Sequence, residues 1–410
     1  MKTLRIFAIA LVSLMTANMA YARVNNLTVT VVNPSRQNRP QSTVELNADS
    51  ILQLLGSKFC YVKDIAGNEI PSQVTYDGKL IFQSSLAPGA SAEYTVSPSS
   101  SRHDYPKLTS GRRYPERADD VAWENELVGF RLYGPKTQAK GEKAYGYDLF
   151  FKHENPEQVL ETLYADELNP ANWAKMDSLK KISNKLAREF KNTFTYHKDH
   201  GKGMDCYAVG PTLGDGCTAF VVNDSLSCTW CYEKERVLDN GPLRFTVELE
   251  FAPRTIGKDN AAREHRIISL DAGSHLNHTK VWLENVSEPK RIVTGFPLRD
   301  EMSPVVTSRY LAYSDPTQGN KNGRAMVGLV TVNPFGTTSV KEKHILGQTE
   351  IPLSECNSDS TEPFEYYWGY SWHKPTSSLP ATTALDSWRD YLSEFSENLA
   401  APLRVTVSAR

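Results

Sequence analysis

The sequence predicts a mainly β protein, in which a small N-terminal β-sandwich is followed by a larger stack of sheets with a few helices. Short stretches that alternate apolar and polar residues, such as residues 27–31, recur along most of the chain. Turn signals that contain glycine, such as residues 76–78, separate these stretches. Strands this numerous can bury their apolar faces only by stacking as sheets.

The N-terminal part, residues 23–100, is expected to form the small sandwich. After the first alternating strand, similar short strands follow at residues 59–62, 80–82 and 93–96. This rhythm stops at the segment SPSSSRHDYP, residues 97–106, whose serine and proline content is typical of a linker. The second domain is therefore expected to span residues 101–410.

The second domain continues the strand pattern, with strands predicted at residues 127–134, 145–152, 217–223, 242–251, 265–273 and 326–332. Two helices interrupt it, because apolar residues recur there at steps of three and four. One stripe comprises Trp173, Met176, Leu179, Ile182, Leu186 and Phe190, and the other comprises Trp388, Leu392, Phe395 and Leu399. We interpret both stripes as core contacts, and the lysines of the first helix as its solvated face.

The first residues have the pattern of a secretory signal peptide. Lys2 and Arg5 precede an apolar run at residues 6–15, and Ala20 and Ala22 place small residues at the cleavage-site spacing. We expect cleavage near Ala22 and a periplasmic or secreted protein. No later run is long and apolar enough to span a bilayer, so no membrane partner is expected.

The charge balance argues against one broad class of partner. The 410 residues include 46 basic and 48 acidic side chains, a net charge of -2, so no nucleic-acid partner is expected. A hydrophobic content of 40% with 23% charged residues is typical of a folded globular protein. Neither figure indicates an oligomeric state.

Four of the six cysteines lie close together in the sequence: Cys206, Cys217, Cys228 and Cys231. In an oxidising compartment this favours one or two structural disulfides, joining Cys228 to Cys231 or Cys206 to Cys217. A zinc site needs closely spaced ligands at both ends, and only Cys228 and Cys231 have that spacing. No metal site is predicted.

The stretch YHKDHGKGMDCYAVGPTLGDG, residues 196–216, combines titratable side chains with several glycines. It is too polar for a core and too rich in glycine for a helix, which predicts a strand end that runs into a loop. If residues 196–200 are extended, His197 and Asp199 share one face while His200 lies on the other. His197 or His200 is then a candidate base, and the alternative is a pair of surface histidines in a glycine loop.

The segment ADDVAWENELVGFRLYGP, residues 118–135, mixes aromatic, amide and carboxylate side chains. A sugar needs such a mixture, because its apolar ring faces stack and its hydroxyl groups form directional hydrogen bonds. Trp123, Asn125 and Arg131 are therefore candidate substrate-binding residues. A buried tryptophan with a strand-entry turn explains the segment equally well.

The segment REHRIISLDAGSHLNHTKVW, residues 263–282, supplies an arginine and several histidines. Arg266 is a candidate clamp for a carboxylate, because its planar fork matches two oxygens. An ion pair with a neighbouring acid is the ordinary alternative. His275, which follows the glycine of this segment, is a further candidate for substrate binding.

The segment YYWGYSWHKP, residues 366–375, places five aromatic residues before a histidine and a lysine. This density indicates a sugar-stacking rim, with Trp372 and His373 as its candidate contacts. Core packing explains some of the rings, but it does not need all of them.

Together, these segments resemble a family of exported bacterial proteins, a domain of unknown function encoded among polysaccharide-degradation genes, which includes the ulvan oligosaccharide dehydratase. The resemblance rests on motifs that follow one another across residues 100–300: DDVAWEN with FRLYGP, YHKDHGKGMDCYAVGPTLG, VLDNGPLR and REHRIISLDAGSHLN. It extends less distinctly to the C-terminus.

The resemblance implies a galactose-mutarotase-like β-supersandwich for the second domain. It also implies a carbon–oxygen lyase, a dehydratase, which eliminates water across C4 and C5 of a uronic acid at the non-reducing end of an oligosaccharide. The reaction needs a cation for the carboxylate, a base for the C5 proton and an acid for the departing hydroxyl. Arg266 or Lys152 would hold the carboxylate, and His197, His200 or Tyr207 would move the protons. No cofactor is implied.

Three alternatives remain open at this point. A polysaccharide lyase uses the same elimination but expels a sugar instead of water. A non-catalytic carbohydrate-binding protein would need only the aromatic and polar contacts. Glycoside hydrolysis by two carboxylates would use Asp119, Asp120 or Glu124.

Overall fold

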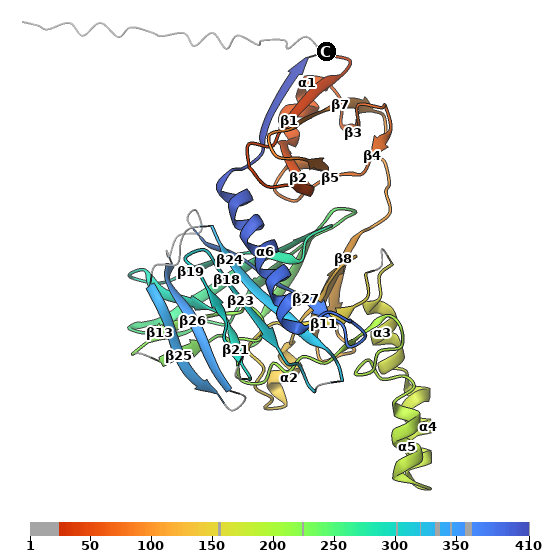
Figure 1. Cartoon of the computed structure of the whole chain (residues 1–410), viewed down its shortest axis with the longest axis vertical. Coiled ribbons are helices and arrows are strands. Elements are labelled where there is room, and N and C mark those ends of the chain that lie inside the picture. Colours follow the sequence, from red (N-terminus) through yellow and green to blue (C-terminus); the bar gives the residue numbers. More distant parts are fainter. Residues whose placement is uncertain are drawn as a thin grey trace, which may run out of the picture.

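The chain folds into a small β domain that sits at one end of a larger β domain (Figure 1). The computed structural model describes residues 24–154, 157–223, 225–300, 302–319, 321–332, 337–344, 347–356 and 363–409. The predicted signal peptide, residues 1–22, lies outside the described residues.

The small domain is the predicted sandwich of two antiparallel sheets. Its N-terminal elements are β1 (Leu27–Val32), β2 (Arg39–Asn47), α1 (Ala48–Leu55), β3 (Phe59–Lys63), β4 (Glu69–Ile70), β5 (Ser72–Val74), β6 (Lys79–Leu86) and β7 (Ser91–Ser99). One sheet has the order β28-β1-β7-β3-β4 and the other has the order β2-β6-β5. Alternate residues of β1, including Val29 and Val31, are buried between them with Phe82 of β6. The predicted alternation therefore marks the core face.

The last strand of the chain, β28 (Arg404–Ala409), belongs to the small domain and not to the large one. It pairs antiparallel with β1, from Leu27 opposite Ala409 to Val32 opposite Arg404. The expected boundary of the second domain at residue 410 therefore needs correction, because this strand crosses back to the first domain. A local sequence pattern identifies a strand but not a distant partner strand.

The large domain consists of three sheets. The first, in the order β12-β11-β10-β9-β8, contains β8 (Thr109–Tyr114), β9 (Asp120–Asn125), β10 (Gly129–Leu132), β11 (Asp148–Lys152) and β12 (Gly203–Asp205). The second, in the order β14-β13-β20-β26-β21 with β25 beside β26, contains β13 (Thr218–Val222), β14 (Ser225–Cys228), β20 (Lys290–Thr294), β21 (Phe296–Leu298), β25 (Thr337–His344) and β26 (Gly347–Cys356).

The third sheet is the largest, with nine strands in the order β15-β16-β18-β19-β27-β24-β23-β22 and β17 beside β18. Its strands are β15 (Lys234–Asn240), β16 (Arg244–Glu250), β17 (Arg254–Ile256), β18 (Asp259–Asp271), β19 (Leu276–Glu284), β22 (Val305–Val306), β23 (Tyr310–Asp315), β24 (Arg324–Thr331) and β27 (Phe364–His373). Among the described residues, every strand pairing within these three sheets is antiparallel.

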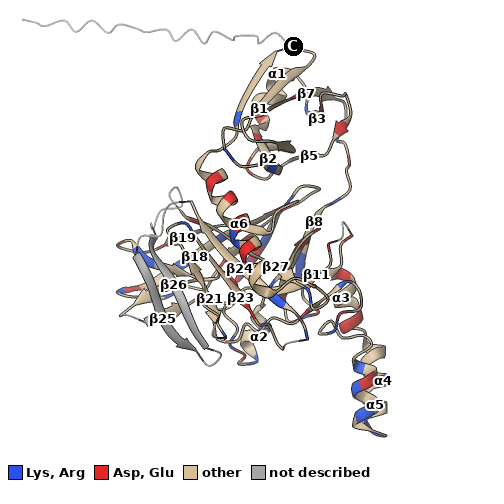
Figure 2. Ribbon diagram, in the orientation of Figure 1, with Lys and Arg blue, Asp and Glu red and all other residues tan. Residues whose placement is uncertain are grey.

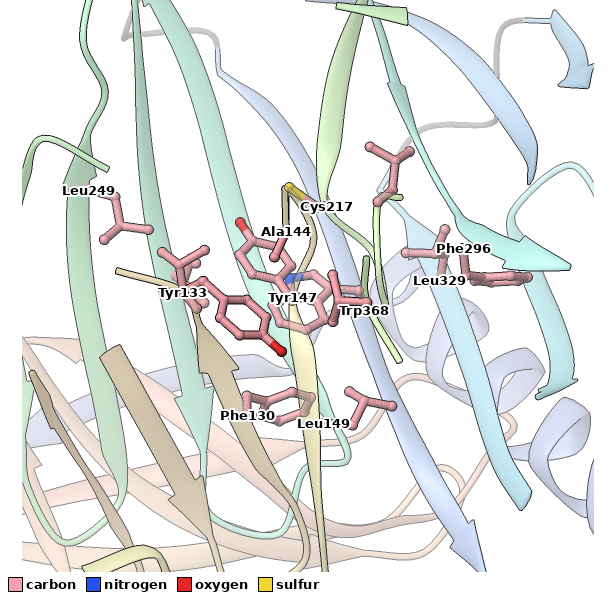
Figure 3. Packing of buried hydrophobic residues seen from close by; sticks show 14 of the residues in the cluster. Phe130, Tyr133, Ala144, Tyr147, Leu149, Cys217, Leu249, Phe296, Leu329 and Trp368 are labelled. Carbon is pink, nitrogen blue, oxygen red and sulfur yellow. The ribbon is translucent and has the colours of Figure 1, made fainter. Parts of the chain in front are cut away.

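The main core lies between the nine-stranded sheet and the two smaller sheets. Figure 3 shows Phe130 and Leu149 of the first sheet facing Trp368 of β27. The rings of Tyr147 and Trp368 stack with their centroids 4.2 Å apart. The predicted fold class, mainly β with stacked sheets behind a small sandwich, is confirmed.

The C-terminal helix α6 (Ala381–Ala400) covers part of the other face of the nine-stranded sheet. Trp388 and Leu392 are buried against β23 and β24, as the second apolar stripe predicts. Close packing depends on Gly328 of β24, because a Cβ atom there would lie 2.6 Å from the Leu392 side chain. The helix then runs on toward the small domain (Figure 1).

The first predicted helix is two helices, and its apolar stripe is not a core contact. α4 (Pro170–Lys180) ends before Ser183, whose hydroxyl caps α5 (Asn184–Lys191). The pair projects from the large domain (Figure 1), and Ile182 and Leu186 are exposed. The prediction is wrong because Trp173 and Phe190 pack on Phe194 and on lysines of the hairpin instead of on the core. The remaining helices, α2 (Pro135–Ala139) and α3 (Leu160–Glu167), lie in the same half of the chain.

Candidate functional site

A cleft of about 530 Å³ opens beside the N-terminal half of α6, at the end of β27. We call it the α6 cleft. Its aromatic lining consists of His275, Trp372, His373, Trp388 and Tyr391. Its other polar lining consists of Glu154, Ser371, Lys374, Thr376, Ser377 and Ser387. Three predicted substrate-binding residues, His275, Trp372 and His373, therefore meet in one place.

Strand pairing brings these three residues together although almost 100 positions separate them. β19 pairs with β27 from Leu276 opposite Gly369 to Val281 opposite Phe364. His275, which immediately precedes β19, therefore lies beside Tyr370, close to Trp372 and His373 at the end of β27. Gly369 is required for this approach, because a Cβ atom there would lie 2.1 Å from the carbonyl oxygen of His275. A side chain at position 369 would displace the histidine from the cleft.

The imidazole of His275 is held in one orientation and one tautomer. Its Nδ1 lies 3.0 Å from the carbonyl oxygen of Tyr370, and because a carbonyl only accepts, Nδ1 carries the proton. Nε2 makes no hydrogen bond to any described residue, so its lone pair is available. Burial lowers the pKa of His275, which favours the neutral ring. This arrangement is suited to a general base.

Two aromatic side chains of α6 fix the other wall. The His275 ring meets the rings of Trp388 and Tyr391 edge to face, at centroid distances of 5.7 Å and 5.4 Å. The backbone N–H of His275 donates to the hydroxyl of Tyr391 over 3.2 Å. Trp388 donates from Nε1 to the carbonyl oxygen of Val327. The apolar spacing predicts Trp388 as a core residue, but it gives no signal that the same helix face also lines a cleft.

His153 connects the cleft wall at Trp372 to the predicted loop at residues 196–207. The His153 ring packs against Trp372 with centroids 5.2 Å apart, and its Nε2 lies 2.8 Å from Oδ2 of Asp199. Asp199 also accepts from the backbone N–H groups of Gly201 and Gly203. The loop therefore lies one layer behind the cleft wall and does not line the cleft itself.

The two histidines of that loop are on the surface. Residues 196–200 form turns and not the extended strand end considered above. His197 donates from Nδ1 to the carbonyl oxygen of Asp205 over 3.0 Å, and Nε2 of His200 lies 3.2 Å from the carbonyl oxygen of Thr195. Both side chains are exposed. His197 has the same tautomer as His275 but no place in the α6 cleft.

Residues 31–405 match the family described as a domain of unknown function, DUF4861. The chain belongs to this family. An uncharacterised protein, P7, of Formosa agariphila is 26% identical to this DUF4861 chain over 396 residues, which cover 92% of the chain and 93% of P7.

Two solved structures resemble this DUF4861 chain at low identity. One is an α-mannosidase from Enterococcus faecalis V583 (10% identity) and the other is a glycosyl hydrolase family 38 protein from Enterococcus faecalis (9% identity). Each has a TM-score of 0.48 over 94% of the chain. The chain spans about half the length of each, 46% and 48% respectively.

Three of the predicted site residues of the DUF4861 chain, Trp123, Asn125 and Tyr207, are buried and contact other parts of the fold instead of solvent. The ring of Trp123 is in the main core, and its Nε1 donates to Asn277 over 2.8 Å. Asn125 shapes a turn by donating to the carbonyl oxygens of Asp271 and Ser274. Tyr207 lies beneath the guanidinium of Arg299, and burial raises the pKa of its hydroxyl. These residues cannot contact an oligosaccharide, so their predicted roles are corrected to structural ones.

The predicted cationic clamps are buried in ion pairs. Lys152 lies 2.7 Å from Oε2 of Glu124, which also accepts from the backbone at the start of α3. Arg266 donates to Glu264 over 2.7 Å and to the hydroxyl of Tyr147 over 2.9 Å. Both cations therefore neutralise internal acids, the ordinary alternative named above, and neither reaches the α6 cleft.

Arg131 and the three acids considered for glycoside hydrolysis are structural as well. Arg131 is buried between Asp148 and Asp205, and lies 2.8 Å from the latter. Asp119 pairs with Arg113 over 2.7 Å, and Asp120 is fully buried and accepts from the backbone N–H of Gly134. No open carboxylate pair results from this part of the described chain.

The predicted disulfides are not formed. Cys206, Cys217 and Cys231 carry free thiols, so neither the Cys206–Cys217 nor the Cys228–Cys231 bond exists in this structure. Sγ of Cys217 instead lies 3.0 Å from Nη1 of Arg266. The described residues contain no cluster of three or more metal-ligating side chains. They also contain no helix long and apolar enough to cross a membrane.

Proposed function

We propose that this protein is a carbohydrate-active enzyme, a carbon–oxygen lyase that removes water from a uronic acid at the non-reducing end of an oligosaccharide. The α6 cleft is the proposed active site. The observation that carries the proposal is the neutral, oriented imidazole of His275, whose Nε2 is available beside a lysine, a second histidine and aromatic rings. The dehydratase chemistry itself comes from the family resemblance.

The proposed step is an elimination in which His275 acts as the base. The ammonium of Lys374 neutralises the carboxylate at C5, so the proton on C5 becomes more acidic. Nε2 of His275 removes that proton, and the electron pair of the C–H bond becomes the C4–C5 double bond. The bond from C4 to its hydroxyl oxygen breaks, and the hydroxyl leaves as water after receiving a proton from His373. The products are an unsaturated uronate and one water.

The other lining residues suit sugar binding. The ring of Trp372 is fixed because Nε1 donates to the carbonyl oxygen of Asn322 over 3.0 Å. A fixed ring offers a flat apolar surface at small entropic cost. Ser371, Ser377 and Ser387 bring hydroxyl groups that can both donate to and accept from sugar hydroxyls.

The test is incubation of the protein with oligosaccharides that carry a 4-hydroxyl uronate at the non-reducing end. The proposal predicts new ultraviolet absorbance from the unsaturated uronate and a mass that falls by one water, with the chain length unchanged. Shorter chains that carry the same chromophore would indicate a polysaccharide lyase instead. No product from any uronate oligosaccharide, at any enzyme concentration, would contradict both.

The second candidate is a non-catalytic carbohydrate-binding protein. The aromatic and hydroxyl lining of the α6 cleft supports it, because these groups bind a sugar without performing chemistry. It predicts a measurable affinity for oligosaccharides in calorimetry and no change in substrate mass after prolonged incubation.

A further inference from the structure

The hairpin of α4 and α5 differs in charge from the rest of the protein. Residues 170–191 contain six basic side chains and two acidic ones, a net charge of +4, whereas the whole chain carries -2. Figure 2 shows these charges on a hairpin that projects from the large domain. Such a local excess on a projecting element attracts anionic surfaces.

The end of the hairpin combines cations with exposed apolar side chains. We call Lys180, Lys181, Ile182, Lys185 and Leu186 the hairpin tip. Ile182 is 76% exposed and Leu186 is 43% exposed, and both are among the larger apolar side chains that the fold leaves open. All three lysines are exposed. Lys185 lies 3.9 Å from Glu189, and no ion pair is found for Lys180 or Lys181 among the described residues.

The aromatic rings of the hairpin are covered by its own lysine side chains. The tip therefore has no open ring on which a sugar can stack. The Lys191 ammonium lies 5.2 Å from the ring centroid of Trp173, and the Lys175 ammonium lies 4.5 Å from that of Phe190. Trp173 also donates from Nε1 to the carbonyl oxygen of Glu167. The tip therefore offers aliphatic groups and cations, which match an acyl-chain boundary beneath anionic head groups better than a polysaccharide.

We propose that the hairpin tip docks on an anionic phospholipid surface. Ile182 and Leu186 enter the boundary between head groups and acyl chains, while Lys180, Lys181 and Lys185 lie against the phosphates. The contact is peripheral and reversible, because two apolar side chains and a few lysines make a weak anchor. It amends the expectation of no membrane partner, which concerned spanning segments, and it is independent of the proposed enzyme activity.

The test is sedimentation of residues 23–410, which lack the predicted signal peptide, with vesicles of phosphatidylglycerol and phosphatidylcholine or of phosphatidylcholine alone. We expect binding only to the anionic vesicles, and its loss as salt is raised from 50 mM to 500 mM. Replacement of Lys180 and Lys181 by glutamine should weaken binding roughly thirtyfold, and Ile182→Ser should weaken it roughly tenfold. The matched control replaces Lys140 and Lys143, also exposed, by glutamine and should bind as wild type.

Three outcomes would overturn the proposal. The wild-type chain could fail to bind anionic vesicles, it could bind neutral vesicles equally well, or the control pair could weaken binding as much as the tip pair. Binding to soluble polygalacturonate that depends on Lys180 and Lys181, without vesicle binding, would instead assign the tip to an acidic polysaccharide. Circular dichroism of each variant confirms that the fold is retained.

Discussion

The Nδ1 atom of His275 lies 3.0 Å from the carbonyl oxygen of Tyr370, and this hydrogen bond determines which ring nitrogen faces the α6 cleft. His275 immediately precedes β19 and Tyr370 belongs to β27, and Gly369 allows the two backbones to approach. A neutral histidine with Nε2 available is thus a consequence of strand pairing.

The pH dependence of catalysis should reflect the lowered pKa of His275. Burial favours the neutral ring, so the base stays unprotonated to a lower pH than an exposed histidine, whose pKa is about 6.5. The acid limb of the kcat/KM profile should therefore fall below pH 6.5. An acid limb clearly above that value would show that another group is the base.

Lys152→Ala should lower stability and activity together. The substitution leaves the carboxylate of Glu124 buried without its cation, which typically costs about 3–5 kcal/mol of unfolding free energy. Urea denaturation followed by tryptophan fluorescence measures the loss. If the variant is as stable as wild type but has lost turnover, Lys152 has a catalytic role and the structural role assigned to it here is wrong.

Asp215→Asn should raise the melting temperature near neutral pH. Both carboxylate oxygens of Asp215 are buried without a hydrogen-bond partner among the described residues, and burial raises the pKa of the acid, with Asp315 adding to it. An acid whose pKa is higher in the folded state destabilises the fold as pH rises above its unfolded value of about 3.9. The variant and the wild type should melt together near pH 4 and diverge by a few degrees at pH 7. If the difference in melting temperature between the variant and the wild type is the same at pH 4 and pH 7, the pKa of Asp215 is not raised in the folded protein.

The cysteines should behave as buried thiols. Burial raises the pKa of Cys206 and Cys217, and raises that of Cys231 to about 12, so little thiolate forms at pH 8. These thiols should react slowly with a thiol reagent until the protein unfolds, and reductant should leave the melting temperature unchanged. A drop on reduction that corresponds to about 2 kcal/mol would reveal a disulfide of the kind predicted from the sequence.

Local patterns predicted the strands well, since alternation and periodicity depend on neighbours in the sequence. The apolar stripe of α6 and the alternation of β1 both mark buried faces. Patterns could not predict that β28 joins the small domain, because strand pairing over several hundred residues leaves no local signal. The apolar stripe at residues 173–190 was wrongly predicted to contact the core for a similar reason. Periodicity does not show whether a helix packs on the core or on another helix.

The candidate site was predicted in part, and the errors have one physical cause. The sequence gives the same residue type whether a charged side chain binds a substrate or neutralises a buried partner. Arg266 and Lys152 both neutralise a buried partner. The partner of Arg266 is Glu264 on the same strand, and the partner of Lys152 is Glu124, 28 positions earlier in the sequence. His275, Trp372 and His373 were found because aromatic and histidine side chains at strand ends seldom serve the core alone. Lys374 lies in the same segment but was not among the predicted contacts, and Glu154 and Tyr391 carried no signal.

The central claim is that His275 in the α6 cleft, and not a histidine of the loop at residues 196–207, is the base. Its most direct test compares the turnover of His275→Gln, His197→Gln and His278→Gln on uronate oligosaccharides. The comparison uses variants whose melting temperatures equal that of the wild type. His278 is the control, since it pairs with Glu365 over 2.8 Å outside the cleft. The account predicts a loss of roughly a hundredfold or more for His275→Gln alone, the usual scale for a general base. Full activity in His275→Gln together with loss of activity in His197→Gln would contradict it.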